Sequence, residues 1–153
     1  MKTLVLGASG ATGKLVVSQL LERNISARIV IRESASISDK ITKDKNIEIV
    51  KGNIDSFSMD KIRELLLDCD SVVCCLGHNI SFRGLIGQPQ KLVVNAVKKI
   101  STAIASDHTA KKFILMSTTA YTNKNQGEKN TFGENLILSL LEIVLPPHKD
   151  NIL

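Results

Sequence analysis

Short runs of consecutive apolar residues alternate along this chain with stretches in which apolar residues recur every three to four positions. The runs predict strands at 4–6, 27–31, 47–50, 71–76 and 113–116. The periodic stretches predict helices at 14–23, 59–67 and 90–106, whereas the polar segment 34–46 predicts at most a weak helix. Because strands that are buried on both faces read as unbroken apolar runs, the pattern predicts an α/β protein. Its core is a doubly wound parallel sheet with helices on both faces.

The connections between these elements limit the order of the strands. Right-handed crossovers between parallel strands predict the order 3-2-1-4-5. In such a sheet a ligand binds where the order reverses, which is at the carboxyl ends of the strands at 4–6 and 71–76. We therefore look for candidate chemistry at the residues that follow the strands.

The C-terminal part of the chain has a different pattern. Residues 122–131 are polar and predict a loop, and residues 134–145 are apolar on nearly all sides. A helix of that kind is buried on more than one side. This helix and the one at 90–106 leave apolar surface for a partner, so we expect a homo-oligomer.

A glycine-rich turn follows the first strand and opens the first helix. It reads Gly7-Ala8-Ser9-Gly10-Ala11-Thr12-Gly13, with its glycines three apart. In this context the first glycine permits a sharp turn, the second lets the backbone approach a pyrophosphate, and the third lets the helix pack against the strand. We expect the backbone N–H groups and the positive helix end to bind that pyrophosphate. The expected cofactor-binding residues here are Gly7, Ser9, Gly10, Ala11, Thr12 and Gly13.

A competing interpretation of this turn fails on its spacing. Gly13-Lys14 resembles the end of a phosphate-binding P-loop, but that motif needs Gly at position 8 and Ser or Thr at position 15. This chain has Ala8 and Leu15 there. The turn therefore does not predict magnesium-dependent nucleotide hydrolysis.

Arg32 follows the second strand, about 20 residues after the glycine turn, where dinucleotide-binding proteins read the ribose. An acidic residue there binds the 2′-hydroxyl of NAD, whereas an arginine accommodates the 2′-phosphate of NADP. Arg32 therefore favours NADP, and Ser34 adds a hydroxyl for the same phosphate. Glu33 leaves NAD open as the less favoured cofactor.

The ends of the third and fourth strands supply further candidates. Asn53 and Ile54 follow the third strand, where they are expected to bind adenine, although a Gly-Asn pair also forms turns without any ligand. Leu76 and Gly77 follow the fourth strand, and Gly77 allows the backbone to approach the pyrophosphate or the nicotinamide ribose. His78 comes next and is read as a surface residue.

Hydroxyl side chains follow the fifth strand, opposite the expected nicotinamide. Ser117 and Thr118 are predicted to bind the cofactor, and Ser117 and Tyr121 are the catalytic candidates. Tyr121 could donate a proton only if a nearby cation lowered its pKa. Ordinary hydrogen bonding at a strand end is the alternative for these hydroxyls.

Composition and charge limit the kinds of partner, metal site and cellular location that we expect. The 153 residues suit a single domain spanning 1–153. Aromatic residues make up only 3% and Trp is absent, and the net charge of +5 comes largely from scattered lysines, so we expect no nucleic-acid partner. Three cysteines without a CxxC pair indicate reduced thiols, and the histidines lack ligand spacing for a metal. The start lacks a signal-peptide pattern and no apolar run reaches membrane-spanning length, so a cytoplasmic protein without a membrane partner is expected.

Taken together, these segments resemble the atypical short-chain dehydrogenase/reductase family, which includes NmrA-like and biliverdin reductase B-like NAD(P)H-binding proteins. The resemblance rests on residues 7–13, 30–32, 51–54 and 113–118 and extends through essentially the whole chain. It implies a Rossmann-type fold with NADP(H) as the cofactor. It also implies hydride transfer to a small carbonyl, flavin or quinone-like acceptor.

The chain departs from that family at three places. Asn53 stands where members usually have Asp, and Tyr121 is followed by Asn125 instead of the lysine of the Tyr-x-x-x-Lys pair. The family also continues past a helix like 134–145 into another strand and a small substrate-binding region, so the C-terminal substrate region is expected to be absent here. These departures leave a second hypothesis open, a non-catalytic NADP sensor that acts through a protein partner in the NmrA-like manner.

Overall fold

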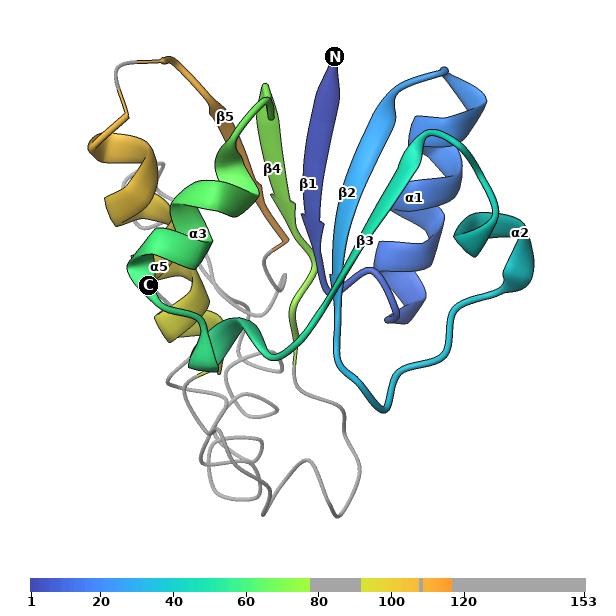
Figure 1. Cartoon of the computed structure of the whole chain (residues 1–153), viewed down its shortest axis with the longest axis horizontal. Coiled ribbons are helices and arrows are strands. Elements are labelled where there is room, and N and C mark those ends of the chain that lie inside the picture. Colours follow the sequence, from blue (N-terminus) through green and yellow to red (C-terminus); the bar gives the residue numbers. More distant parts are fainter. Residues whose placement is uncertain (78–91, 108, 117–153) are drawn as a thin grey trace, which may run out of the picture. The chain divides into compact units, whose positions relative to one another are not determined.

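The structure of the chain, a computed structural model, describes residues 1–77, 92–107 and 109–116. Residues 1–77 and 95–116 belong to one compact unit. Its centre is a parallel sheet of five strands in the order β3-β2-β1-β4-β5, which confirms the predicted order (Figure 1). The strands are β1 (Lys2–Leu6), β2 (Ser26–Ile31), β3 (Ile47–Lys51), β4 (Ser71–Cys74) and β5 (Lys112–Leu115).

The helical elements of the described residues are α1 (Ala11–Glu22), α2 (Asp39–Thr42), the single-turn η1 (Ile54–Ser56), α3 (Met59–Leu66) and α5 (Leu92–Ala105). Of these, α1, α3 and α5 fall where the apolar periodicity predicts helices. The short α2 is the weak helix that the polar segment 34–46 allows, and the sequence did not predict η1. Figure 1 shows α1 and α2 beside the β2–β3 half of the sheet, and α3 and α5 over the β4–β5 half. Among the described residues, no helix is long and apolar enough to cross a membrane.

One face of the sheet forms a core with α1 and α2. Ala27, Ile29 and Ile31 alternate along β2 and pack with Val17 of α1 and Ile41 of α2. Thr3 of β1 and Ser71 of β4 are also buried, and their hydroxyl groups satisfy each other at 2.9 Å. The core on this side of the sheet therefore includes one buried pair of hydroxyl groups that share a hydrogen bond.

The opposite face carries a buried arginine. Arg28 is 8% exposed, and its Nε donates to Oε1 of Glu48 on β3 at 2.8 Å. Its Nη1 donates to the carbonyl oxygens of Leu65 and Leu67 at 2.8 Å, and to that of Glu64 at 3.2 Å. These carbonyls lie at the C-terminal end of α3, where a helix lacks amide donors for its last carbonyl groups. Two of them accept a second bond nearby, Glu64 from the Leu67 amide at 3.2 Å and Leu65 from the Cys69 thiol at 3.5 Å. Arg28 thus fixes α3 to the sheet.

Several elements differ from the predicted ones in their boundaries, and one strand differs in its burial. The first helix begins at Ala11 instead of residue 14, because Gly10 already acts as its N-cap. β4 ends at Cys74 instead of Leu76, since its pairing with β5 ends where Met116 N–H donates to the Cys74 carbonyl. β5 lies at the edge of the described sheet, and Ile114 and Leu115 are 47% and 39% exposed, so this strand is not covered as its apolar run predicts.

Candidate dinucleotide-binding site

The glycine turn between β1 and α1 has the tight geometry that its sequence predicts. Gly7 has a φ of +78°, a conformation that side chains other than glycine rarely adopt. Gly10 N–H donates to the Gly7 carbonyl at 3.0 Å and closes the turn. Gly13 is buried, and a Cβ atom there would overlap the same carbonyl oxygen and lie 2.8 Å from the Ala8 Cα. The helix can therefore approach the turn only because Gly13 lacks a side chain.

The N-terminus of α1 is open to an anion. Gly10 caps the helix without any side-chain hydrogen bond, and no acidic residue lies in the first turn. The Lys14 amide makes the first bond of the helix, to the Gly10 carbonyl at 3.0 Å. The amides of Ala11, Thr12 and Gly13 precede it and have no partner within the helix. Ala11 and Thr12 are exposed and Ser9 is half-buried, so this end of α1 can bind a phosphate group.

The glycine turn also meets the end of β4. A Cβ atom on Gly7 would lie 2.7 Å from the Cys75 carbonyl oxygen and 3.0 Å from the Leu76 nitrogen. Gly77 has more room, because its nearest neighbour would be Met116 Cε at 3.9 Å. Since β1 has β2 on one side and β4 on the other, the strand order reverses at this point. The sequence predicts the ligand crevice at this point, and Gly7 and Leu76 come together there. Their contacts with a ligand stay predictions.

The end of β2 presents Arg32 to solvent. Arg32, Glu33 and Ser34 are all exposed, and the Ala35 amide donates to the Arg32 carbonyl at 2.9 Å, which turns the chain. An exposed guanidinium at the end of a strand suits a phosphate group. Its binding to the 2′-phosphate of NADP stays a prediction.

The turn after β3 begins beside the end of β2, because Gly52 N–H donates to the Ile31 carbonyl at 2.9 Å. Asn53 Oδ1 accepts from the Asp55 amide at 3.1 Å and so caps η1, while Ile54 is buried. The turn-forming role that the sequence left open for Asn53 is present in the structure. The Oδ1 atom has a second lone pair, so the cap leaves it able to accept from the adenine amino group as well. That role in binding adenine stays a prediction.

Two residues that the sequence did not single out also reach this turn. Asn95 Nδ2 donates to Asp55 Oδ1 at 2.8 Å, and Lys99 Nζ donates to the carbonyl oxygens of Asp55 and Phe57 at 2.5 and 2.8 Å. Both residues belong to α5 and lie one helical turn apart. Their only signal in the sequence is a pair of polar residues, four apart, beside the apolar stripe of a predicted helix.

The three cysteines are free thiols and all are buried. Burial is the main cause that raises the pKa of Cys69, Cys74 and Cys75 above the ordinary thiol value. Such thiols are poor nucleophiles and poor ligands at neutral pH. Among the described residues, no group of three or more His, Cys, Asp or Glu side chains could hold a metal ion.

The remaining candidates lie outside the described residues. These are His78, Ser117, Thr118 and Tyr121. The last bond of the β4–β5 ladder reaches Met116, so Ser117 is the next residue along the sequence. Their roles at the nicotinamide end stay predictions.

A parallel sheet of this order has a glycine turn after β1, a helix start without a side-chain cap, and a reversal of strand order at β1 and β4. Together these features define a Rossmann-type dinucleotide-binding protein. Comparison with known families agrees, since the profile of the NAD(P)H-binding family matches residues 7–144. The chain belongs to this NAD(P)H-binding family. The match confirms the resemblance to the atypical short-chain dehydrogenase/reductases that the sequence motifs indicate.

Known proteins place the chain in the same structural group. It is 30% identical over 82 residues to an uncharacterized chloroplastic protein of Arabidopsis thaliana. The matched segment makes up 53% of this chain and 29% of that protein. A short-chain dehydrogenase/reductase from Veillonella parvula in complex with NADP has a TM-score of 0.65 and 14% identity, over 98% of this chain and 60% of that one. The leucoanthocyanidin reductase of Vitis vinifera, bound to NADPH, has a TM-score of 0.58 and 19% identity, over 99% of this chain and 47% of that one. The chain therefore spans less than two thirds of the length of these relatives.

Proposed function

We propose that this chain binds NADP(H) and acts as an oxidoreductase that transfers hydride to a small carbonyl, flavin or quinone-like acceptor. One observation carries the cofactor part of this proposal. The N-terminus of α1, which has no side-chain cap, and the exposed Arg32 lie at the carboxyl ends of neighbouring strands, which suits a pyrophosphate and a 2′-phosphate respectively. A bound nicotinamide would supply the hydride, and the protein would orient it.

Each nominated residue has a part in this proposal. The turn at 7–13 would hold the pyrophosphate, Arg32 and Ser34 the 2′-phosphate, and Asn53 with Ile54 the adenine. Leu76 and Gly77 would lie beside the central ribose, and Ser117 and Thr118 on the nicotinamide side. Ser117 or Tyr121 would then hydrogen-bond the acceptor or supply its proton. NAD is the weaker candidate cofactor, through Glu33.

Cofactor choice is tested by calorimetric titration with NADPH and with NADH. Arg32→Ala is expected to weaken NADPH binding at least about tenfold, because a charge-assisted bidentate contact would be lost. NADH binding should change little, since NADH lacks the 2′-phosphate. Arg63→Ala is the matched control, because Arg63 is an exposed arginine on α3 that pairs with Asp60. Equal losses for both cofactors in Arg32→Ala would count against the 2′-phosphate contact.

A second candidate function is a non-catalytic NADP sensor that signals through a protein partner. One feature of the sequence favours it: Asn125 replaces the lysine that would lower the pKa of Tyr121 in a Tyr-x-x-x-Lys pair. Turnover with quinone, flavin and aldehyde acceptors separates the two functions. Activity that Ser117→Ala or Tyr121→Phe abolishes would remove the sensor hypothesis.

We further propose that the chain forms homo-oligomers in a reducing compartment such as the cytoplasm. The exposed apolar side chains of Ile114, Leu115 and Met116 support self-association. The three free cysteines support a reducing environment. Sedimentation velocity tests the first point, and a single monomeric species across micromolar concentrations would contradict it.

A further inference from the structure

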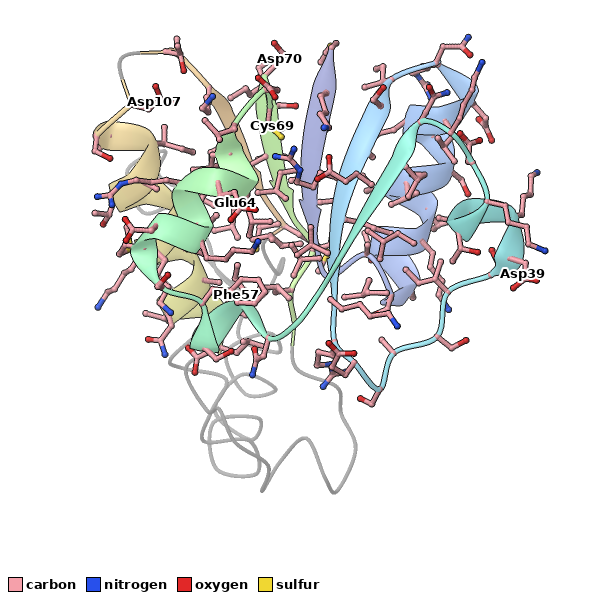
Figure 2. All side chains as sticks on the ribbon, in the orientation of Figure 1. Asp39, Phe57, Glu64, Cys69, Asp70 and Asp107 are labelled. Atoms are coloured by element: carbon pink, nitrogen blue, oxygen red, sulfur yellow. The ribbon has the colours of Figure 1, made fainter. Side chains whose placement is uncertain are left out.

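The turn between β3 and α3, from Gly52 to Phe57, is held in one shape by contacts at both ends. Gly52 has a φ of +145°, and a Cβ atom there would lie 2.5 Å from the Phe57 ring. Ser56 donates to the Asn53 carbonyl twice, from its amide at 3.0 Å and from its hydroxyl at 2.8 Å. Phe57 lies near the carboxyl ends of the strands, whereas Cys69 and Asp70 lie at the other end of the sheet (Figure 2).

These local bonds close only a single 3₁₀ turn of three residues, Ile54–Ser56. Hydrogen bonds in a 3₁₀ turn have poorer geometry than those of an α-helix, and such short pieces have little stability of their own. The conformation of Asn53 and Ile54 therefore depends on contacts from elsewhere in the fold.

Helix α5 supplies those contacts from 40 to 44 residues away in the sequence. Lys99 Nζ bridges the carbonyl oxygens of Asp55 and Phe57, and Asn95 Nδ2 holds the Asp55 carboxylate. Bonds with an ionised donor or acceptor are roughly twice as strong as neutral ones. Because Asn95 and Lys99 lie at positions i and i+4, both extend from one face of α5.

We propose that Asn95 and Lys99 are positioning residues that hold the Gly52–Phe57 turn in the shape that receives the adenine ring. This inference rests on the proposed binding of NADP(H). Neither residue needs to touch the cofactor, since both act through the backbone and side chain of Asp55. Adenine is common to NADPH and NADH, so the loss of either positioning residue weakens both cofactors equally. Arg32→Ala, in contrast, weakens NADPH alone.

Lys99→Met tests the proposal, with Lys98→Met as its matched control. Lys98 is the neighbouring residue on α5 and is exposed, so both variants remove one lysine charge from the same helix. In calorimetric titrations we expect Lys99→Met to weaken NADPH and NADH alike by about tenfold, and Lys98→Met to stay within about twofold of the wild type. A Lys99→Met protein that binds both cofactors as well as Lys98→Met does would overturn the proposal.

A reciprocal exchange provides a second, independent variant. Asn95→Asp places a carboxylate against that of Asp55, so we expect both cofactors to bind more weakly. Adding Asp55→Asn places an amide donor at position 55 opposite the new carboxylate at position 95. The affinity for both cofactors should then recover to within about threefold of the wild type. Absence of any recovery in a folded double variant would contradict the positioning role.

Amide hydrogen exchange without cofactor separates this inference from the proposed function. The Ser56 amide is protected by the Asn53 carbonyl, so it should exchange faster in Lys99→Met than in Lys98→Met. A wild type that binds neither cofactor would refute the proposed function and the adenine role with it, whereas unchanged exchange would refute the positioning of the turn itself.

Discussion

The backbone of Gly7 lies directly against the carbonyl group of Cys75, so closely that a Cβ atom on Gly7 would be 2.7 Å from that oxygen. This contact joins the turn after β1 to the end of β4, where the order of the strands reverses. Two separate features require glycine at this position. A Cβ atom would collide with Cys75, and the φ of +78° is one that other residues rarely adopt. The two borders of the candidate crevice are therefore fixed by a contact that tolerates no side chain.

Gly7→Ala should lower the free energy of unfolding by about 2–4 kcal/mol. The left-handed backbone is strained by a side chain, and the Cβ atom collides with backbone atoms that cannot move aside. Gly77→Ala is the control, since its Cβ would meet nothing nearer than Met116 Cε at 3.9 Å. Urea unfolding measures both, and equal stabilities of the two variants would contradict the close approach at Gly7.

Arg28→Met should destabilise the fold by about 2–3 kcal/mol, because the carbonyl groups at the end of α3 lose the charged donor that they share. Arg63→Met removes an exposed ion pair on the same helix and should cost at most about 0.5 kcal/mol. The comparison is made by urea unfolding at pH 7. Similar values for the two variants would show that Arg28 does not anchor α3.

Glu48 makes stability depend on pH in the acid range. Its hydrogen bond with Arg28 is the main cause that lowers its pKa below the usual value of 4.5. A carboxylate with a lowered folded pKa contributes its full stability above its unfolded pKa, and the contribution is lost as the pH falls through the folded value. We expect Glu48→Gln to be less stable than the wild type at pH 7, with a gap that narrows below about pH 4. A gap that stays constant from pH 7 to pH 3 would contradict this assignment.

The thiols of Cys74 and Cys75 should be unreactive while the protein is folded. Burial raises the pKa of both thiols, so thiolate is scarce at pH 7.5, and the side chains are nearly closed to reagents. Labelling by a chromogenic disulfide reagent is expected to be at least about tenfold slower in buffer than in 6 M guanidinium chloride. Rapid labelling of the native protein would point to an accessible, activated thiol instead.

The arrangement of the sheet was predictable because it depends on patterns that lie within short segments. The apolar runs at 27–31 and 47–50 identify strands, and the handedness of crossovers then fixes their order. The glycine turn was predictable for the same reason, since three glycines after a strand have few other uses. These features are local, and local chemistry determines them.

Contacts across the chain were not predictable. Arg28 sits within an apolar run, and nothing near it in the sequence reveals that its carbonyl acceptors on α3 lie 36 to 39 residues further on. Lys99 looks like an ordinary surface lysine of a helix until α5 is placed beside the β3–α3 turn. Asn53 was open to two interpretations because one carboxamide suits both a cap and an adenine contact. Such partners depend on the assembled fold.

The central claim is that the turn at Gly7–Gly13 binds the pyrophosphate of NADP(H), and Gly10 provides the most direct test. Gly10 has φ and ψ of −74° and 169°, which alanine also adopts, and an added Cβ would lie 3.3 Å from the Gly7 carbonyl. We therefore expect Gly10→Ala to remain folded, while its methyl group blocks the close approach of the pyrophosphate. Calorimetric titration of the wild type and Gly10→Ala with NADPH should give saturable binding to the former and at least about tenfold weaker binding to the latter. Equal affinity in the two proteins, or no binding to the wild type, would contradict the claim.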